Sequence, residues 1–305
     1  MLPIYWLVVY VSLFGGSTLA GKFIVLKIII AMIAFAANSV ICRVALRGNH
    51  IDPVTFTDLR LLSGAVVLLP FFLLRKDGKG SLSLKNGFSL VVYAMCFAIA
   101  YIHLDTGAGA LLLFGVVQLA MVIYGLFHGD RLSPGRAAGL LIASCGLLML
   151  LLPGATAPMP GSALIMALAG LAWATYTLAG KKMPEATAST AGNFLIAASL
   201  ALLVSPFISS GMHADGTGIV LAVMAGAVAS AGAYVLWYSL LPHLDAVTAS
   251  TVQLSVPCLA MLGGVLFTGE SLSLKMVLSA GAVLSGIGIV IGFSRSESSG
   301  SSPAK

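Results

Sequence analysis

The chain of 305 residues is poor in charge, since only 9% of its residues are Asp, Glu, Lys or Arg. A soluble domain carries roughly 25% charged residues. Hydrophobic residues make up 59% of the chain and the mean hydropathy is +1.05. A surface with so little charge has to face lipid, where only helices and closed barrels satisfy the backbone. The composition therefore excludes a soluble fold, and the long apolar runs predict an all-α membrane protein.

Patterns that hold metals, nucleotides or nucleic acids are also missing. The four cysteines lie far apart inside apolar stretches, and none forms a CxxC or Cys/His pattern, so we expect neither a metal nor a disulfide. Gly107 and Gly109 form a Gly-x-Gly string, but within an apolar helix they are packing positions. No basic tract is interleaved with aromatic residues. We therefore expect no cofactor, no nucleic-acid partner and no enzyme active site.

Apolar stretches long enough to cross a bilayer are present instead, and each needs about 20 residues. Ten qualify, at 26–46, 53–75, 86–104, 106–128, 133–153, 161–182, 187–209, 217–241, 245–267 and 273–293. The short links between them leave no room for a soluble domain. Residues 1–25 are interpreted as a hydrophobic N-terminal extension, with an eleventh span as the alternative. The Ser/Gly-rich tail 294–305 is predicted to be disordered.

The chain repeats itself after 140 residues. The string His-Leu-Asp at 103–105 returns at 243–245, and Leu-Phe-x-Gly-(Asp/Glu)-x-Leu-Ser at 126–133 returns at 266–273. Two copies are therefore predicted, at 26–153 and 161–293. Because five spans separate equivalent positions, the second copy is inverted in the membrane. Such duplicated units are typical of secondary transporters, with the substrate site where the copies meet.

Lys and Arg side chains set the orientation, because cytoplasmic links carry an excess of them. If residue 26 begins in the cytoplasm, most basic residues fall on that side, and only Arg47 and Lys275 fall in the opposite loops. We therefore expect both ends of the ten-helix core to be cytoplasmic, in a bacterial inner membrane.

Several motifs, taken in order, resemble the drug/metabolite transporter superfamily in its EamA branch. The strings at 129–134 and 269–273 resemble the loop before the last helix of each half, although Asp130 replaces the usual Glu. The segment from Pro53 to Arg60 resembles the family's second-helix opening, and Trp173-Ala-Thr-Tyr176 its sixth-helix signature. The resemblance covers residues 27–293 and implies a ten-helix exporter of small metabolites. Within the family, the chain looks closest to YddG-type exporters of aromatic and neutral amino acids.

Two aromatic stripes related by the repeat are predicted to line opposite walls of one cavity. Their members are spaced three or four residues apart, so each stripe lies on one helix face. Ordinary helix packing is the alternative, as is a membrane-interface position for Tyr101 and Tyr238. The stripes consist of Tyr93, Phe97 and Tyr101 in the third span and Ser230, Tyr234, Trp237 and Tyr238 in the eighth.

Other candidate substrate-binding residues are two further aromatics, three amides at membrane depth and a histidine at the outer end of the third span. Helix packing and hydrogen bonds between helices are the alternative for the aromatics and the amides. Asp105 and Asp245 are interpreted as caps of the helices that follow them. The candidates are Trp173, Tyr176, Asn38, Gln118, Gln253 and His103.

Four residues are assigned structural or gating roles. Asp58 and Arg60 are two positions apart and point to different sides of their helix. We expect Arg43 to form a structural ion pair with Asp58, and anion binding is the alternative for Arg60. Pro257 is expected to kink the ninth span, because it removes a backbone hydrogen bond.

The predicted function is facilitated export of small amphipathic metabolites, by alternating access through the aromatic cavity. No Asp or Glu lies at the midplane of any span, where proton-driven carriers commonly use carboxylates. The expected solutes are aromatic or neutral amino acids, and the expected state is a monomer or homodimer in the lipid bilayer. An intramembrane enzyme or lipid-handling protein would instead need clustered titratable groups. A nucleotide-sugar carrier of the same fold would need several cavity Lys or Arg.

Overall fold

The computed structural model describes residues 19–74, 82–128, 133–151, 158–180, 185–208, 211–244, 249 and 252–300. These residues are nearly all helical, and within them the one β-contact is a bridge between Ile51 and Ala214. The elements are α2 (Leu19–Arg47), α3 (Pro53–Leu73), α4 (Leu84–Tyr101), α5 (Thr106–Phe127), α6 (Pro134–Leu151), α7 (Pro160–Gly180), α8 (Ala186–Ile208), α9 (Gly216–Gly226), the π-helix η1 (Ala227–Gly232), α10 (Ala233–Leu240), the 3₁₀ turn η2 (Leu241–His243), α12 (Ser255–Gly263), the π-helix η3 (Gly264–Thr268) and α13 (Leu274–Gly300).

Seven helical segments in the described residues are long and apolar enough to cross a membrane. They are α2, α3, α4, α5, α7, α8 and the continuous segment Gly216–Leu240, which joins α9, η1 and α10. The other predicted spans fall on α6, on α12 with η3, and on α13. Large apolar side chains such as Leu74, Phe127 and Phe207 are at least 80% exposed. A surface of this kind belongs in lipid, so the chain is a multi-pass membrane protein.

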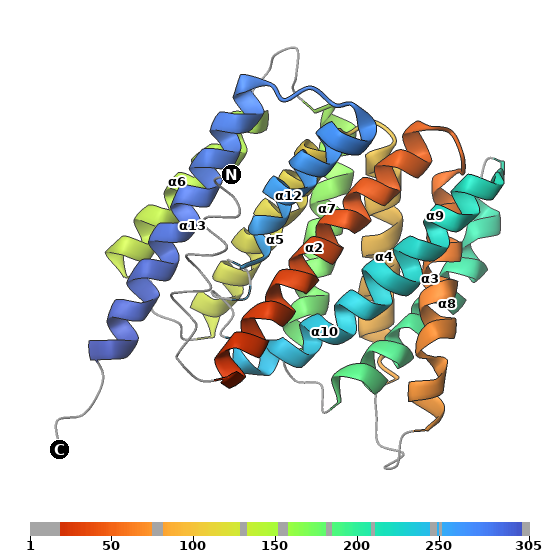
Figure 1. Cartoon of the computed structure of the whole chain (residues 1–305), viewed down its shortest axis with the longest axis horizontal. Helices are drawn as coiled ribbons and strands as arrows, with labels where there is room; N and C mark the ends of the chain where they lie inside the picture. Colours follow the sequence, from red (N-terminus) through yellow and green to blue (C-terminus); the bar gives the residue numbers. More distant parts are fainter. Residues whose placement is uncertain are drawn as a thin grey trace.

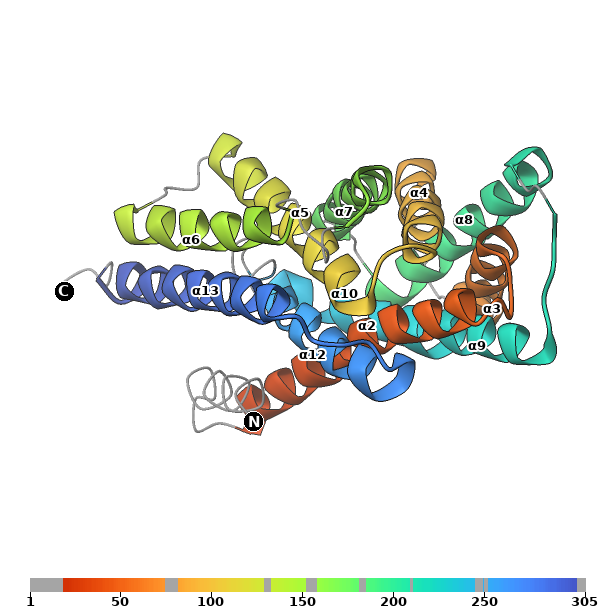
Figure 2. The same ribbon diagram turned by 90° about the horizontal axis from the view of Figure 1, so that it is seen from above.

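The helices form one bundle, and α2 runs diagonally across the middle of the view in Figure 1. The pair α6 and α13 lies at one end of the bundle, and α3, α8 and α9 lie at the other (Figure 2). The two backbones of the pair approach closely, because a Cβ added at Gly139 would meet the carbonyl of Gly286, and the reverse holds too. Small residues at a helix crossing permit this packing in membranes.

The ends of the helical core differ from the expected boundaries. Helix α2 begins at Leu19, within the stretch interpreted as an extension, and its candidate membrane span begins at Phe23; residues 1–18 lie outside the described part. Helix α13 continues to Gly300, into the tail expected to be disordered from Ser294. Once a helix exists, each further residue adds one backbone hydrogen bond at little cost.

The ninth span contains an interruption three residues before Pro257. Leu254 is a turn residue between a helical stretch that holds Gln253 and the start of α12 at Ser255. Pro257 has no N–H to donate to the carbonyl of Gln253, four positions earlier. The interruption therefore comes directly after Gln253.

Candidate functional site

An aromatic cluster is buried where the two sequence repeats meet. Every member is at most 5% exposed, and the members come from α2, α4, α7, α8 and α10, which neighbour one another in Figure 1. The aromatic cluster consists of Phe35, Tyr93, Phe97, Tyr101, Trp173, Tyr176, Phe194, Tyr234, Trp237 and Tyr238.

Trp173 joins the two predicted stripes. Its ring centroid lies 4.9 Å from that of Tyr93 on α4 and 4.8 Å from that of Tyr234 on α10. Phe35 of α2 also contacts it, edge to face at 5.5 Å. Sequence reasoning missed Phe35 and Phe194. Phe35 could have been found, because it lies three residues before Asn38 and shares its helix face.

The Arg60 guanidinium lies inside this cluster and links three helical segments. It donates to Ser230 Oγ of η1 (2.9 Å), to Tyr234 Oη of α10 (3.0 Å) and to Tyr93 Oη of α4 (3.3 Å). It also lies 5.3 Å and 5.2 Å from the ring centroids of Tyr93 and Phe97. These distances are in the range of cation–π attraction.

No carboxylate pairs with Arg60 among the described residues, although its side chain is fully enclosed. Arg60 is 1% exposed, and its Nη1 has no hydrogen-bond partner there. Asp58, two positions away, instead accepts a hydrogen bond from Ser205 Oγ of α8 at 2.8 Å. The neutral groups around Arg60 solvate its charge only in part.

The predicted amides differ in their surroundings. Asn38 lines a small cavity with Phe35, Tyr93, Phe97 and Trp173 that has room for about one water molecule, and Asn38 Oδ1 has no partner among the described residues.

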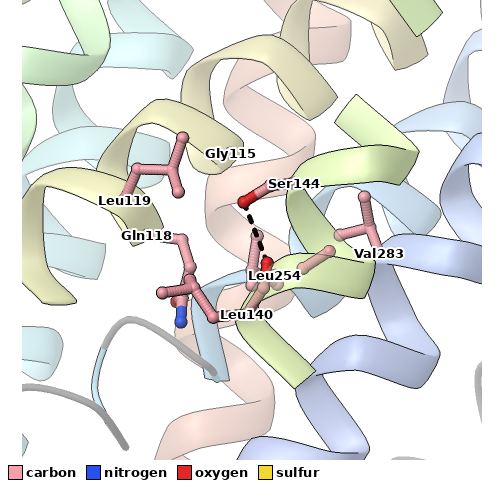
Figure 3. A pocket seen from close by; sticks show the side chains of 8 residues that line it. Gly115, Gln118, Leu119, Leu140, Ser144, Leu254 and Val283 are labelled. Atoms are coloured by element: carbon pink, nitrogen blue, oxygen red, sulfur yellow. Dashed lines mark hydrogen bonds between the residues drawn. The ribbon is translucent and has the colours of Figure 1, made fainter. Parts of the chain in front are cut away.

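Gln253 accepts a 2.7 Å hydrogen bond from Trp173 Nε1 and donates to the carbonyl of Ala249, so it joins the cluster through Trp173. Gln118, in contrast, lies in a separate small pocket between α5, α6 and α13, where its amide nitrogen points away from Ser144 (Figure 3). The structure therefore does not bring Gln118 to the aromatic cluster.

Arg43 does not pair with Asp58, so this expectation is wrong. Its guanidinium lies 3.2 Å from both Glu270 and Asp105, and it donates to the carbonyls of Tyr101 and Ile102 at 2.8 and 2.9 Å. The reason is position: Arg43 lies near the end of α2, beside the α4–α5 link, whereas Asp58 faces α8. The face of a helix on which a residue lies follows from the sequence, but whether Arg43 pairs with Asp58 or with Glu270 and Asp105 does not.

Glu270, and not Asp105, caps α5. Its carboxylate accepts hydrogen bonds from Thr106 N at 2.9 Å and Thr106 Oγ1 at 3.0 Å. Asp105 occupies the N-cap position, but its side chain makes no capping bond because it pairs with Arg43. We call this arrangement of Arg43, Asp105, Thr106 and Glu270 the Arg43–Glu270 clamp. Asp245 lies outside the described residues.

A second contact joins the α2–α3 link to the α8–α9 link. Asp52 accepts from the backbone of His213 at 3.0 Å, and His50 lies 2.7 Å from Asp215. Burial raises the pKa of Asp52, but hydrogen bonds from Thr55 and from backbone amides, including that of His213, lower it by more, to below its ordinary 3.8.

The hydrogen bond from His50 likewise lowers the pKa of Asp215. A lowered carboxyl pKa stabilises the contact above the ordinary pKa, and this stabilisation is lost as the pH falls through the lowered value. His103 is exposed in the α4–α5 link, outside the cluster.

A family model describes two copies of one unit in this chain. The model of the EamA-like transporter family matches residues 22–152 and again residues 161–292. The chain belongs to the EamA-like transporter family. The aromatic cluster therefore lies between two EamA units, since α2 and α4 belong to the first and α7, α8 and α10 to the second.

Similar proteins cover nearly the whole of the EamA pair. An uncharacterized protein of Pseudomonas aeruginosa is 45% identical over 86% of this chain and 92% of its own length. Proteins named probable amino-acid metabolite efflux pumps, from Salmonella typhimurium and Escherichia coli, are both 24% identical, over 87% and 85% of this chain and 94% and 91% of their own. One solved crystal structure shares the fold, with a TM-score of 0.66 at 19% identity over 88% of this chain and 97% of the other.

Proposed function

We propose that this EamA transporter exports small amphipathic metabolites, foremost aromatic or neutral amino acids, across a bacterial inner membrane. The observation that carries the proposal is the buried aromatic cluster shared by the two EamA units. Inside it, one polar atom each of Arg60 and Asn38 has no hydrogen-bond partner among the described residues. Aromatic walls with a few convergent polar groups are typical of small-molecule sites. The Salmonella and E. coli relatives are named probable amino-acid metabolite efflux pumps, which agrees with this solute class.

The mechanism we propose is alternating access between two units inverted in the membrane. The cavity beside the cluster has room for only about one water molecule, so a solute has to displace rings to enter. The Arg43–Glu270 clamp ties the α4–α5 link of the first unit to the η3–α13 link of the second. Rocking of one unit against the other would break this clamp and open the outer side. The proposed mechanism uses no carboxylate at the membrane midplane, so we propose facilitated export that is not driven by protons.

The cationic groups of the site favour amino acids over nucleotide sugars. A nucleotide diphosphate would call for several cavity cations, but Arg43 is already paired with two carboxylates, which leaves Arg60 alone in the cluster. Lys181 and Lys182 lie outside the described residues. An enzyme would need clustered titratable groups, and the part of the chain described by the structure holds no group of three or more His, Cys, Asp or Glu that could bind a metal ion.

A flux assay in proteoliposomes tests the proposal. Liposomes are loaded with phenylalanine, a drug or a nucleotide sugar, and efflux is compared with that from a Trp237→Ala variant, which removes one wall of the cluster. We expect phenylalanine efflux by the native protein and a loss of about tenfold or more in the variant, since aromatic contacts are worth about 1 kcal/mol or more each. Equal efflux of every solute from both proteins would overturn the aromatic route.

A further inference from the structure

We propose that Arg60 binds the carboxylate of the transported solute, so that the site selects aromatic or apolar carboxylates. This inference rests on the proposed transport function and specifies its substrate class. The observation behind it is a fully enclosed guanidinium with one unused amine, Nη1, and no acidic partner among the described residues.

An enclosed arginine without an acid is unusual at membrane depth. Arginine stays protonated in proteins, and a buried charge is costly unless it is paired. Ionisable residues within spans therefore mark substrate pathways by default. Arg43 provides the contrast in this chain, because two carboxylates and two carbonyls satisfy it. The two arginines have different surroundings, which indicates different roles.

The groups around Arg60 hold it in place without neutralising it. Ser230 and Tyr234 fix Nε and Nη2, and the faces of Tyr93 and Phe97 lie against the guanidinium. A planar guanidinium held in this way presents its remaining donor in a fixed direction, which suits a carboxylate. The π-helix η1 contributes Ser230 to this arrangement, and π-helical segments are frequent at functional sites.

The surroundings favour a carboxylate with an apolar or aromatic body over an inorganic anion. Among the described residues Arg60 is the one cation of the cluster, and it lies against Tyr93 and Phe97. Both rings also line the small cavity beside the cluster, whose lining is mostly apolar and aromatic. A hydrated phosphate would lose its water without gaining further cations. A phenyl-bearing carboxylate would pair with Arg60 and pack its ring against the cluster.

Binding to the native protein gives the first test, with no substitution. Fluorescence of Trp173 and Trp237, both in the cluster, reports titration of purified protein with 3-phenylpropionate and with 3-phenylpropanamide. The two compounds have nearly the same shape and differ in charge. We expect the acid to bind at least about tenfold more tightly than the amide, as for a hydrogen bond between charged groups. Equal affinities, or no response to the acid, would overturn the assignment.

Variants of Arg60 separate a binding role from a structural one. Arg60→Gln should bring the affinity of the acid down to that of the amide, and Arg60→Lys should restore part of the difference. Arg47→Gln is the matched control, because Arg47 is exposed and its guanidinium donates to the Thr268 carbonyl, away from the cluster; it should keep the native difference. If the role of Arg60 were purely structural, Arg60→Gln would lower the affinity for the acid and for the amide equally, and this result would contradict the proposal.

The outcomes also distinguish the two levels of inference. If phenylalanine and its amide leave the liposomes at the same rate and Trp237→Ala stops both, the transport function is supported and carboxylate binding by Arg60 is contradicted. If the acid binds through Arg60 but no solute crosses the bilayer, the binding site is supported and export is contradicted.

Discussion

At the scale of single residues, Gly226 shows how closely α9 and α3 approach each other. A Cβ at this position would meet the backbone carbonyl of Arg60 and the Ser63 hydroxyl. The backbone cannot yield as a flexible side chain would. Gly226 therefore sets the depth at which the turn of α3 bearing Arg60 lies against the second EamA unit.

Gly226→Ala should destabilise the protein by about 1–3 kcal/mol, the usual cost of overpacking, and should weaken carboxylate binding by displacing Arg60. Thermal unfolding in detergent measures the first effect. Gly281→Ala is the control, because Gly281 lies inside α13 and a Cβ there meets nothing within 4 Å. It should leave stability unchanged or raise it by up to about 1 kcal/mol. A melting temperature for Gly226→Ala equal to that of the control would contradict the close contact.

Residue spacing predicts which helix face a side chain occupies, and this is why the stripes of Tyr93 and Tyr234 could be expected to meet. Partners across the fold follow from no such rule. Arg43 pairs with Glu270, which lies 227 positions away, and nothing in the spacing prefers this acid to Asp58. The lack of an acidic partner for Arg60 among the described residues could not be predicted either, because it depends on where every nearby acid is placed.

At the scale of elements, the end of η3 and the start of α5 are held together by Glu270. Its carboxylate serves both as the cap of α5 and as the partner of Arg43. One side chain therefore stabilises a helix end and the contact between two EamA units. The spacing of apolar residues predicts the α-helices of this chain, but it does not predict the π-helical segments η1 and η3. A short π-helical segment changes the number of residues per turn without leaving a distinct apolar pattern in the sequence.

Glu270→Gln should weaken the contact between the α4–α5 link and the link after η3, and so make the predicted outer side of the bundle more accessible. The charge-assisted bonds to Glu270 weaken, and Asp105, whose side chain is 53% exposed, is then the one carboxylate that Arg43 keeps among the described residues. We expect the buried Cys42, next to Arg43 on α2, to react about tenfold faster with a membrane-impermeant maleimide once the other three cysteines are serine.

Asp215→Asn, in the other contact between links, is the control for a lost outer carboxylate and should leave Cys42 protected. An unchanged rate in Glu270→Gln would show that the clamp does not close the outer side.

At the scale of the whole molecule, the links at the outer ends of the predicted spans are found together in pairs. The α2–α3 link contacts the α8–α9 link, and the α4–α5 link contacts the link after η3. Hydropathy and the positions of Lys and Arg predict that all four links face the outside. The exact ends of the bundle were not predictable, since α2 and α13 extend beyond their most apolar stretches.

Single cysteines in a background without native cysteine test this sidedness in intact cells. Exposed positions His103 and His213 should react with an impermeant reagent from outside. Exposed positions Lys85 and Glu185, at the other ends of α4 and α8, should react only after the membrane is permeabilised. Labelling of His103→Cys and Lys85→Cys from the same side would be incompatible with the proposed topology.

The isolated charge of Arg60 has an electrical consequence. A site that is cationic when empty and neutral when it holds a carboxylate responds to voltage mainly when empty, by up to about 2.3 kcal/mol per charge for each 100 mV. The negative interior of a respiring cell would draw the vacant site inward, toward the compartment where solute is loaded. Efflux recorded under imposed potassium diffusion potentials of either sign would reveal this bias, and identical rates would show that the charge does not sense the field.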